Sequence, residues 1–404
     1  MKYLSAKEIF RAPGARGGLP AWTYFNDELT RLELEQVFLR NWMFVAHVSD
    51  IPNSGDYQCF EMADERALVV RGEDGAVRGF HNLCRHRASR VVAEQKGHCG
   101  KAMICPFHGW SYNLDGTLRN IPKADSFPDL DPREFGLKPL DCEVWKGMIF
   151  VRFGGDGPSI ADLFAEAAAE VDLYRIEEMQ PLDAPWRYNF DLDWKAVLDI
   201  DSEGYHVPVG HPELFDLVGA TYTDQVTAGG LARAYGAIDQ RRHRLDRNQE
   251  YVAALPEESY LPDSHSNLWI YWGMFPGFVL TLFPDQIEIY QTFPTGVGKS
   301  AMAGVTYALP DQRPEMQRAR ALNRDINMGV GDEDVQLVKW AAEGMRSNAF
   351  DGLVMSDLEL GVAAFQNRLR EVLPVVKLEE EPESGSLRQL NKSLRAQGNV
   401  ASVG

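Results

Sequence analysis

Short apolar runs separated by turn residues dominate the chain between residues 42 and 153. Residues 67–70 and 148–151 are typical of buried β-strands. The dipeptide Asp115-Gly116 is a strong signal for a hairpin turn. This pattern predicts a small all-β unit.

The pattern changes on both sides of this unit. Before it, Asn26 can cap a helix whose apolar side chains follow helical spacing: Leu29, Leu32, Leu34, Val37, Phe38 and Leu39. After it, the glycine-rich residues 154–158 indicate a domain junction. Beyond the junction we expect strands at 186–192 and within 269–308, and helices at 194–205, 317–327, 334–347 and 361–373. Strands followed by helices laid across them predict an α+β fold class.

Four parts of the chain follow from these patterns. Residues 1–40 are a helical leader that we expect to pack on the second, larger domain, and residues 41–155 are the all-β domain. Residues 156–377 form the larger domain. Residues 378–404 are acidic and rich in small polar residues, so we expect a mobile tail.

Composition narrows the class of protein. The net charge of −18 over 404 residues argues against nucleic acid or anionic membranes as partners. The longest apolar run, residues 268–283, is interrupted by Gly273, Pro276 and Gly277, which indicates adjacent buried strands rather than a membrane span. Five cysteines, no signal-peptide pattern and no disulfide framework predict a reducing cytoplasmic location.

Two short motifs in the all-β unit each offer one thiolate and one imidazole. They read Cys84-Arg85-His86 and Cys105-Pro106-Phe107-His108. Two cysteines and two histidines can hold a structural zinc ion or an iron–sulfur cluster. A zinc finger pairs its cysteines and then its histidines, whereas each motif here is mixed. The spacing therefore favours a Rieske [2Fe–2S] centre over structural zinc.

A second group of metal-binding residue types lies in the larger domain: Asp199, Asp201, Glu203, His206, His211 and, much later, Asp334. Two histidines five residues apart are about 140° apart around a straight helix, so they share a metal only if the helix breaks. Pro208 and Gly210 lie between them and predict that break. Two histidines and a carboxylate form the facial triad of non-haem Fe(II) oxygenases. A zinc hydrolase uses similar ligands, but the motif His-Glu-x-x-His is absent.

Together these motifs resemble the large (α) subunit of the Rieske non-haem iron oxygenases. The resemblance rests on Cys84-Arg85-His86-Arg87, residues 105–110, Asp193-Trp194-Lys195 and residues 203–211, in the family's order. It implies an N-terminal all-β Rieske domain and a C-terminal catalytic domain of helix-grip type, in which a curved antiparallel sheet wraps a long helix.

The resemblance also implies roles for the motif residues. Cys84 and Cys105 would hold one iron of the cluster, and His86 and His108 the other. His206 and His211 would hold the catalytic iron. Asp334 aligns best as the third ligand, with Asp332 as the reserve and Asp357 as a more distant choice. Glu203 matches the carboxylate that connects the two kinds of centre across a subunit boundary, which implies a homotrimer or a multiple of trimers.

The sequence departs from the family's pattern at two places before Glu203. Asp193 replaces the asparagine of Asn-Trp-Lys, and Asp199-Ile200 replaces a Glu-Asn pair. Loss of that second asparagine removes a polar group near the iron, so the substrate preference is expected to differ.

The expected function is that of a terminal oxygenase component. It would use dioxygen and NAD(P)H electrons to hydroxylate, dihydroxylate or oxidatively demethylate a small aromatic or quaternary-ammonium compound. Trp269, Tyr271 and Phe275 are candidate pocket residues, with core packing as the alternative. Because Gly-x-Gly-x-x-Gly and a plant-type ferredoxin cysteine pattern are absent, a separate reductase, with or without a ferredoxin, must supply electrons. A Rieske electron-transfer protein without a catalytic iron is the competing hypothesis.

Overall fold

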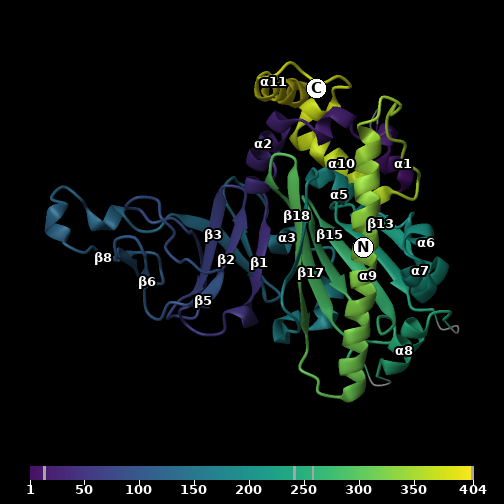
Figure 1. The fold of residues 1–404 in the computed structure, drawn as a ribbon, viewed down its shortest axis with the longest axis horizontal. Coiled ribbons are helices and arrows are strands. Elements are labelled where there is room, and N and C mark those ends of the chain that lie inside the picture. The colour runs from purple at the N-terminus through teal and green to yellow at the C-terminus, as the bar shows by residue number, and fades with distance from the viewer. Residues whose placement is uncertain (12–14, 240–242, 257–258, 402–404) are drawn as a thin grey trace. The chain divides into compact units, whose positions relative to one another are not determined.

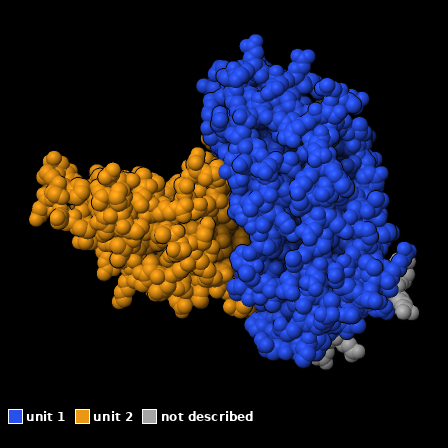
Figure 2. Space-filling view, viewed as in Figure 1, with its two compact units in different colours: residues 1–38, 163–176, 181–404 blue, residues 39–162, 177–180 orange. Residues whose placement is uncertain are grey.

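The structure is a computed structural model that describes residues 1–11, 15–239, 243–256 and 259–401. The chain divides into two compact units, which Figure 2 shows in different colours. The larger unit consists of residues 1–38, 163–176 and 181–404, and the smaller unit of residues 39–162 and 177–180. Each unit is described by itself.

The smaller unit is built from two antiparallel sheets. The first has the strand order β1-β10-β9-β4-β3-β2-β5. Its strands are β1 (Met43–His47), β2 (Asp56–Met62), β3 (Glu65–Arg71), β4 (Val77–His81), β5 (Lys96–His98), β9 (Pro139–Trp145) and β10 (Met148–Arg152). The second sheet has the order β6-β7-β8 and consists of β6 (Met103–Ile104), β7 (Ser111–Tyr112) and β8 (Leu118–Asn120).

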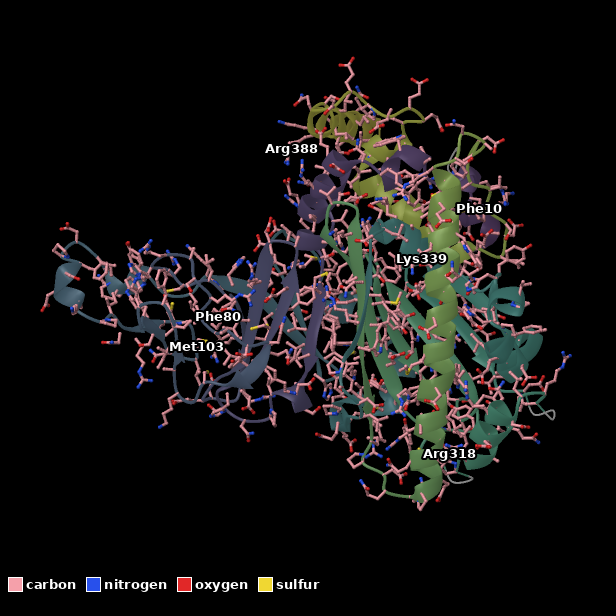
Figure 3. The ribbon with its side chains drawn as sticks, in the orientation of Figure 1. Phe10, Phe80, Met103, Arg318, Lys339 and Arg388 are labelled. Carbon is pink, nitrogen blue, oxygen red and sulfur yellow. The ribbon has the colours of Figure 1, made fainter. Side chains whose placement is uncertain are left out.

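The predicted hairpin at Asp115-Gly116 is confirmed. Tyr112 of β7 pairs with Leu118 of β8, and Gly116 has a φ of +86° in the turn between them. A Cβ at Gly116 would lie 2.3 Å from the Phe80 ring, so both the conformation and the space require glycine. Phe80 and Met103 belong to the apolar core of this unit (Figure 3). That core holds the two sheets together.

The larger unit contains an eight-stranded antiparallel sheet that curves around a long helix. Its strand order is β11-β18-β17-β16-β15-β14-β13, and β12 also pairs with β18. The strands are β11 (Gln180–Pro181), β12 (Trp186–Phe190), β13 (Thr223–Val226), β14 (Ala232–Ala237), β15 (Leu268–Met274), β16 (Phe278–Leu282), β17 (Ile287–Gly296) and β18 (Lys299–Ala308). Figure 1 shows helix α9 lying along this sheet. The predicted α+β class and helix-grip arrangement are confirmed.

The helices of the described chain are mostly short, with α9 as the long exception. They are α1 (Ala6–Ile9), α2 (Asp27–Gln36), α3 (Ile160–Leu163), α4 (Ala168–Val171), α5 (Trp194–Asp201), α6 (Val207–Gly210), α7 (Pro212–Val218), α8 (Asp246–Ala254), α9 (Pro314–Met345), α10 (Leu360–Val372) and α11 (Leu387–Ala401). Asn26 caps α2 as expected, because its side chain accepts a hydrogen bond from the Leu29 N–H. Within the described chain, we find no helix long and apolar enough to cross a membrane.

Helix α9 corrects a prediction. The separate helices expected at 317–327 and 334–347 are one continuous helix in the structure. Gly329 and Gly331 lie inside it, and each costs about 1 kcal/mol relative to alanine in a helix. Apolar side chains on both sides of the two glycines are buried, including Ile326 and Val338, so tertiary packing outweighs the local preference for a break.

Buried charges connect the N-terminal segment to helix α5. Lys195 is fully buried, and its Nζ lies 2.7 Å from both Glu33 Oε1 and Asp193 Oδ1. The Trp194 indole N–H donates to the other oxygen of Glu33. Asp193, the departure from the family's asparagine, thus supplies a second carboxylate to the lysine. Removing the lysine would leave both carboxylates buried without their cation, at a cost of about 3–5 kcal/mol.

The C-terminal segment differs from the mobile tail that composition suggested. Residues 387–401 form α11, and Leu387 is fully buried. Arg388, labelled in Figure 3, forms a bidentate ion pair with Glu35 of α2 at 2.6 Å. The buried leucine and this ion pair hold the helix against α2, which local composition does not reveal.

Candidate metal centres

The two mixed motifs of the smaller unit have the same backbone design. The Cys84 carbonyl accepts from the Ala88 N–H, and the Cys105 carbonyl accepts from the Gly109 N–H, both at 3.1 Å. Ala88 and Gly109 have φ values of +59° and +73°. Each cysteine therefore begins a tight turn that closes through a left-handed residue, and the histidine lies within that turn.

The two turns bring the four predicted cluster ligands together. Cys84 and Cys105 are each 2% exposed, and burial raises the pKa of the Cys84 thiol, with the adjacent Cys105 adding to the rise. The rings of His86 and His108 have centroids 4.6 Å apart. Nδ1 of His86 is buried and has no hydrogen-bond partner among the described residues. Two adjacent thiols and an imidazole nitrogen without a partner fit a [2Fe–2S] group of mixed ligation.

Aromatic side chains fix this site from one side. The Trp110 ring stacks on His86, with centroids 5.0 Å apart and an interplanar angle of 4°. The buried Tyr112 hydroxyl lies 3.2 Å from Cys84 Sγ and accepts a hydrogen bond from the Arg85 N–H. Because that N–H already occupies a lone pair, the hydroxyl proton is free to point at the sulfur.

In the larger unit, three side chains converge on one point. One ligand atom each from His206, His211 and Asp334 lie within 4.8 Å of one another. The two Nε2 atoms are 2.9 Å apart, and Asp334 Oδ1 lies 3.0 Å from Nε2 of His211 and 3.6 Å from Nε2 of His206. Ligand atoms held at right angles about 2.1 Å from a metal are about 3.0 Å apart. The buried Asp334 Oδ1 also lacks a hydrogen-bond partner among the described residues, so the three atoms fit one face of a mononuclear iron site.

Two further carboxylates orient the histidines. Nδ1 of His206 lies 2.5 Å from Glu203 Oε1, and Nδ1 of His211 lies 2.8 Å from Glu333 Oε2. A proton on each Nδ1 leaves each Nε2 free for a metal. Burial lowers the pKa of His206, but Asp334 and Glu203 outweigh burial and raise it to about 10. The site therefore holds positive charge strongly.

The chain break that brings the histidines together is earlier than predicted. Helix α5 ends at Asp201, and His206 does not close it but begins the short helix α6. Glu203 Oε2 accepts the N–H groups of Tyr205 and His206 and shapes the turn. His211 follows α6 directly, and its N–H donates to the Val207 carbonyl.

The three candidate carboxylates for the third ligand lie in different surroundings. Asp334 lies in the middle of α9, not near a helix start, and its carboxylate meets both histidines. Asp332 faces the Tyr188 hydroxyl at 3.4 Å. Asp357 pairs with Arg16. The structure thus brings only Asp334 of these three to the histidines.

A cavity of about 450 Å³ lies next to the triad. Its wall consists of residues from strands β12 to β18, the end of α5, and α9, together with the segments that carry the two histidines. Asp201 and Glu288 are two carboxylates of this wall. Burial, and for Asp201 also the charge of Asp334, raises the pKa of each to about 7.

Known families match both parts of the chain. The family model for the Rieske [2Fe-2S] domain matches residues 41–133, and the model for the ring hydroxylating alpha subunit (catalytic domain) matches residues 181–374. The glycine betaine monooxygenase oxygenase subunit of Chromohalobacter salexigens is 33% identical over 389 residues, with 86% of this chain and 84% of that protein covered. The chain belongs to the Rieske non-haem iron oxygenases. It is of the α-subunit type.

Two more comparisons describe the extent of the likeness. The corresponding subunit of Pseudomonas aeruginosa strain UCBPP-PA14 is 32% identical, and that match spans 51% of this chain but only 48% of that protein's length. A crystal structure of a quaternary ammonium Rieske monooxygenase is 20% identical with a TM-score of 0.76. The alignment covers 92% of this chain and 99% of that one, which shows that the two chains have the same fold.

The structure corrects part of the predicted pocket of this oxygenase. Tyr271 lines the cavity as expected. Trp269 does not, because its ring packs in the core against Phe283 and its indole N–H donates to Tyr251. Phe275 lies outside the cavity wall and contacts Phe365. Phe275 follows the last residue of β15, so the predicted set does not share one strand.

Several residues of the oxygenase's cavity were not predicted: Trp186, Tyr188, Tyr222, Glu288 and Tyr290. Their signal in the sequence is alternation, as in Trp-x-Tyr at 186–188 and Glu-x-Tyr at 288–290. Asp199, a member of the predicted acidic group, faces away from the triad and bonds to Tyr24 and Gln366. Asp201 of the same group lines the cavity.

Proposed function

We propose that this chain is the terminal oxygenase component of a multicomponent Rieske system. Dioxygen and NAD(P)H electrons would hydroxylate, dihydroxylate or oxidatively demethylate a small aromatic or quaternary-ammonium compound. In a monooxygenation, one oxygen atom enters a C–H bond of the substrate and the other leaves as water, with two electrons from NAD(P)H. The observation that supports this proposal most is the convergence of His206, His211 and Asp334 beside a cavity of substrate size.

Each proposed cofactor has a complete set of side chains. We assign one [2Fe–2S] cluster per chain to Cys84, Cys105, His86 and His108, and one Fe(II) to His206, His211 and Asp334. When bound, the cluster supplies single electrons and the mononuclear iron activates dioxygen. Glu203 and Glu333 hold the Nδ1 protons of the two histidines, so that both Nε2 atoms face the metal.

The proposed partners follow from what the chain lacks and what it exposes. A separate reductase, with or without a ferredoxin, would deliver the electrons. The Glu203 side chain is only 8% exposed, but Tyr205 and Val209 of the same segment are 57% and 86% exposed. A solved quaternary ammonium Rieske monooxygenase shows inter-subunit electron transfer. We therefore propose a homotrimer or a multiple of trimers, in which Glu203 lies on the electron route from a neighbouring cluster, and a cytoplasmic location.

Metal content tests the proposal directly. An oxygenase carries three irons per chain, two in the cluster and one in the triad, whereas an electron carrier carries two and a zinc-stabilised protein carries zinc without visible absorption. We expect close to three irons, and dioxygen uptake that requires NAD(P)H, a reductase and a small substrate. Two irons per chain after reconstitution with Fe(II) would refute the catalytic part of the proposal.

A further inference from the structure

The two arginines in the cavity wall are already paired with carboxylates of the chain. Arg233 forms a bidentate pair with Glu170, at 2.7 and 3.0 Å. Arg324 lies 3.2 Å from Asp183. Among the described residues that line the cavity, no other arginine and no lysine occurs. Apart from the two histidines of the triad, the wall therefore offers no spare cation for an anionic or carboxylate-bearing substrate.

Two carboxylates of the wall, in contrast, have only neutral partners in the contacts that the structure gives. Asp201 Oδ1 accepts from the Tyr290 hydroxyl at 2.9 Å, and Glu288 Oε1 accepts from the Trp186 indole N–H at 2.6 Å. Asp201 Oδ2 is buried and has no hydrogen-bond partner among the described residues. A buried carboxylate oxygen without a donor is unfavourable, so a ligand that brings a charged donor is favoured there.

Aromatic rings surround these two acids. The Trp186 ring lies 5.6 Å from Tyr188 and 6.0 Å from Tyr290, measured between centroids. Gly304 pairs with both Trp186 and Tyr290 on neighbouring strands, and a Cβ there would lie 2.5 Å from the tryptophan ring. The missing side chain lets both rings close over the same part of the wall. Electron-rich ring faces attract a cation.

This part of the wall adjoins the triad. Asp201, Tyr188 and Asp334 line both this cavity and a second, smaller one. A nitrogen bound at Asp201 would therefore lie in a part of the cavity that Asp334 also lines. Relatives named for betaine and carnitine act on nitrogens that carry no N–H.

We propose that Asp201 and Glu288 bind the protonated nitrogen of an N-alkylated amine, which donates an N–H to Asp201 Oδ2 while Trp186, Tyr188 and Tyr290 surround its alkyl groups. This inference rests on the proposed oxygenase function and names its substrate class. Within the proposed function, it replaces the quaternary-ammonium substrate by a protonated amine, because a quaternary nitrogen cannot donate to Oδ2. It also excludes zwitterions whose carboxylate would lie beside the two acids.

Matched probes test the inference by binding rather than turnover. Protonated dimethylaminoethanol has an N–H, choline has the same charge without an N–H, and 3,3-dimethylbutanol is the neutral carbon analogue. Titration calorimetry on the iron-loaded protein should show dimethylaminoethanol binding at least tenfold more tightly than 3,3-dimethylbutanol and several-fold more tightly than choline. Glycine betaine should bind more weakly than choline.

Neutral variants of similar shape test whether Asp201 and Glu288 are the residues that bind the amine. Asp201→Asn and Glu288→Gln should each weaken binding of dimethylaminoethanol at least tenfold and leave 3,3-dimethylbutanol within twofold. Tyr290→Phe keeps both carboxylates but removes the hydroxyl that donates to Asp201, so we expect a smaller loss of amine affinity. This variant replaces an acid variant that fails to fold. Glu343→Gln, an exposed acid of α9 outside the cavity wall, is the matched control.

The outcomes separate this inference from the proposed function. Choline binding as tightly as dimethylaminoethanol would overturn the N–H donor, and 3,3-dimethylbutanol binding as tightly as the amine would overturn the cation site. Unchanged amine binding in both acid variants would overturn the assignment to Asp201 and Glu288. In each case iron content and reductase-dependent dioxygen uptake report on the oxygenase function independently.

Discussion

The two candidate metal sites are built in opposite ways. In the smaller unit, all four ligands come from two short turns, and each cysteine lies within three residues of its histidine. In the larger unit, the histidines come from the broken chain after α5, whereas Asp334 comes from the middle of α9, more than a hundred residues later. The first site is a local structure, and the second depends on how α9 packs on the sheet.

Their surroundings differ as well. The cysteines are buried and their neighbours are aromatic and hydroxyl groups, whereas each histidine of the triad has its own carboxylate. Neutral donors near a thiolate adjust a redox potential. Carboxylates behind imidazoles strengthen a metal ligand and fix its orientation. The difference fits one site that stores electrons and another that must keep its metal while leaving coordination positions open.

The largest test separates the two sites completely. His206→Ala removes a ligand of the triad but no residue of the smaller unit, so we expect the visible absorption of the cluster to persist while substrate-coupled dioxygen uptake falls at least about 1,000-fold. Cys105→Ser should do the reverse, with loss of the visible absorption and retention of one iron. Iron analysis with absorption spectra measures both. Loss of both centres in either variant would mean that the sites are not independent.

The next test concerns the ligand that comes from α9. Asp334→Ala should release the mononuclear iron and lower activity at least about 100-fold, because two imidazoles alone hold Fe(II) weakly. Asp332→Ala is the matched control on the same helix, since its carboxylate faces Tyr188. Iron content after dialysis, followed by turnover with added Fe(II), checks the result. Equal iron loss in the two variants would contradict the assignment of Asp334.

These tests also mark what the sequence could and could not predict. The cysteine and histidine motifs were readable because their spacing is local, and the structure brings all four side chains together. The histidine pair was readable from Pro208 and Gly210, although the helix breaks earlier. The sequence predicted separate helices at 317–327 and 334–347, and burial of side chains in both halves, such as Ile326 and Val338, explains why they form one helix.

The cavity was the least predictable part. Of the predicted pocket residues, Trp269 and Tyr271 lie two positions apart on β15, yet only Tyr271 lines the cavity, and Phe275 follows the end of that strand. Asp201 and Glu288 lie 87 positions apart in the sequence, so their meeting depends on strand order and on where α5 ends. Such relations are tertiary, and no local pattern contains them.

A smaller effect on iron binding is expected from Glu333, which contacts a histidine of the triad but is not a proposed ligand. Glu333→Gln leaves the His211 Nδ1 proton with a neutral acceptor, which weakens the ligand without removing it. We expect a roughly 10–100-fold loss of iron affinity with the cluster unchanged. Competition with a chelator of known affinity measures the loss, and Glu343→Gln controls for removal of one acid from α9. Unchanged affinity would show that the His211–Glu333 contact does not support the metal.

The smallest expected effect concerns the reduction potential of the cluster and the Tyr112 hydroxyl beside it. Tyr112→Phe removes the hydroxyl that can donate to Cys84 Sγ and leaves the ring in place. A hydrogen bond to a thiolate is stronger when the cluster is reduced, because the reduced cluster carries more negative charge. Losing a difference of about 1 kcal/mol lowers the one-electron potential by about 40 mV. Protein-film voltammetry should detect this fall, whereas Tyr57→Phe, in the same apolar core, should leave the potential unchanged. A potential that stays constant in Tyr112→Phe would mean that the hydroxyl proton does not point at the sulfur.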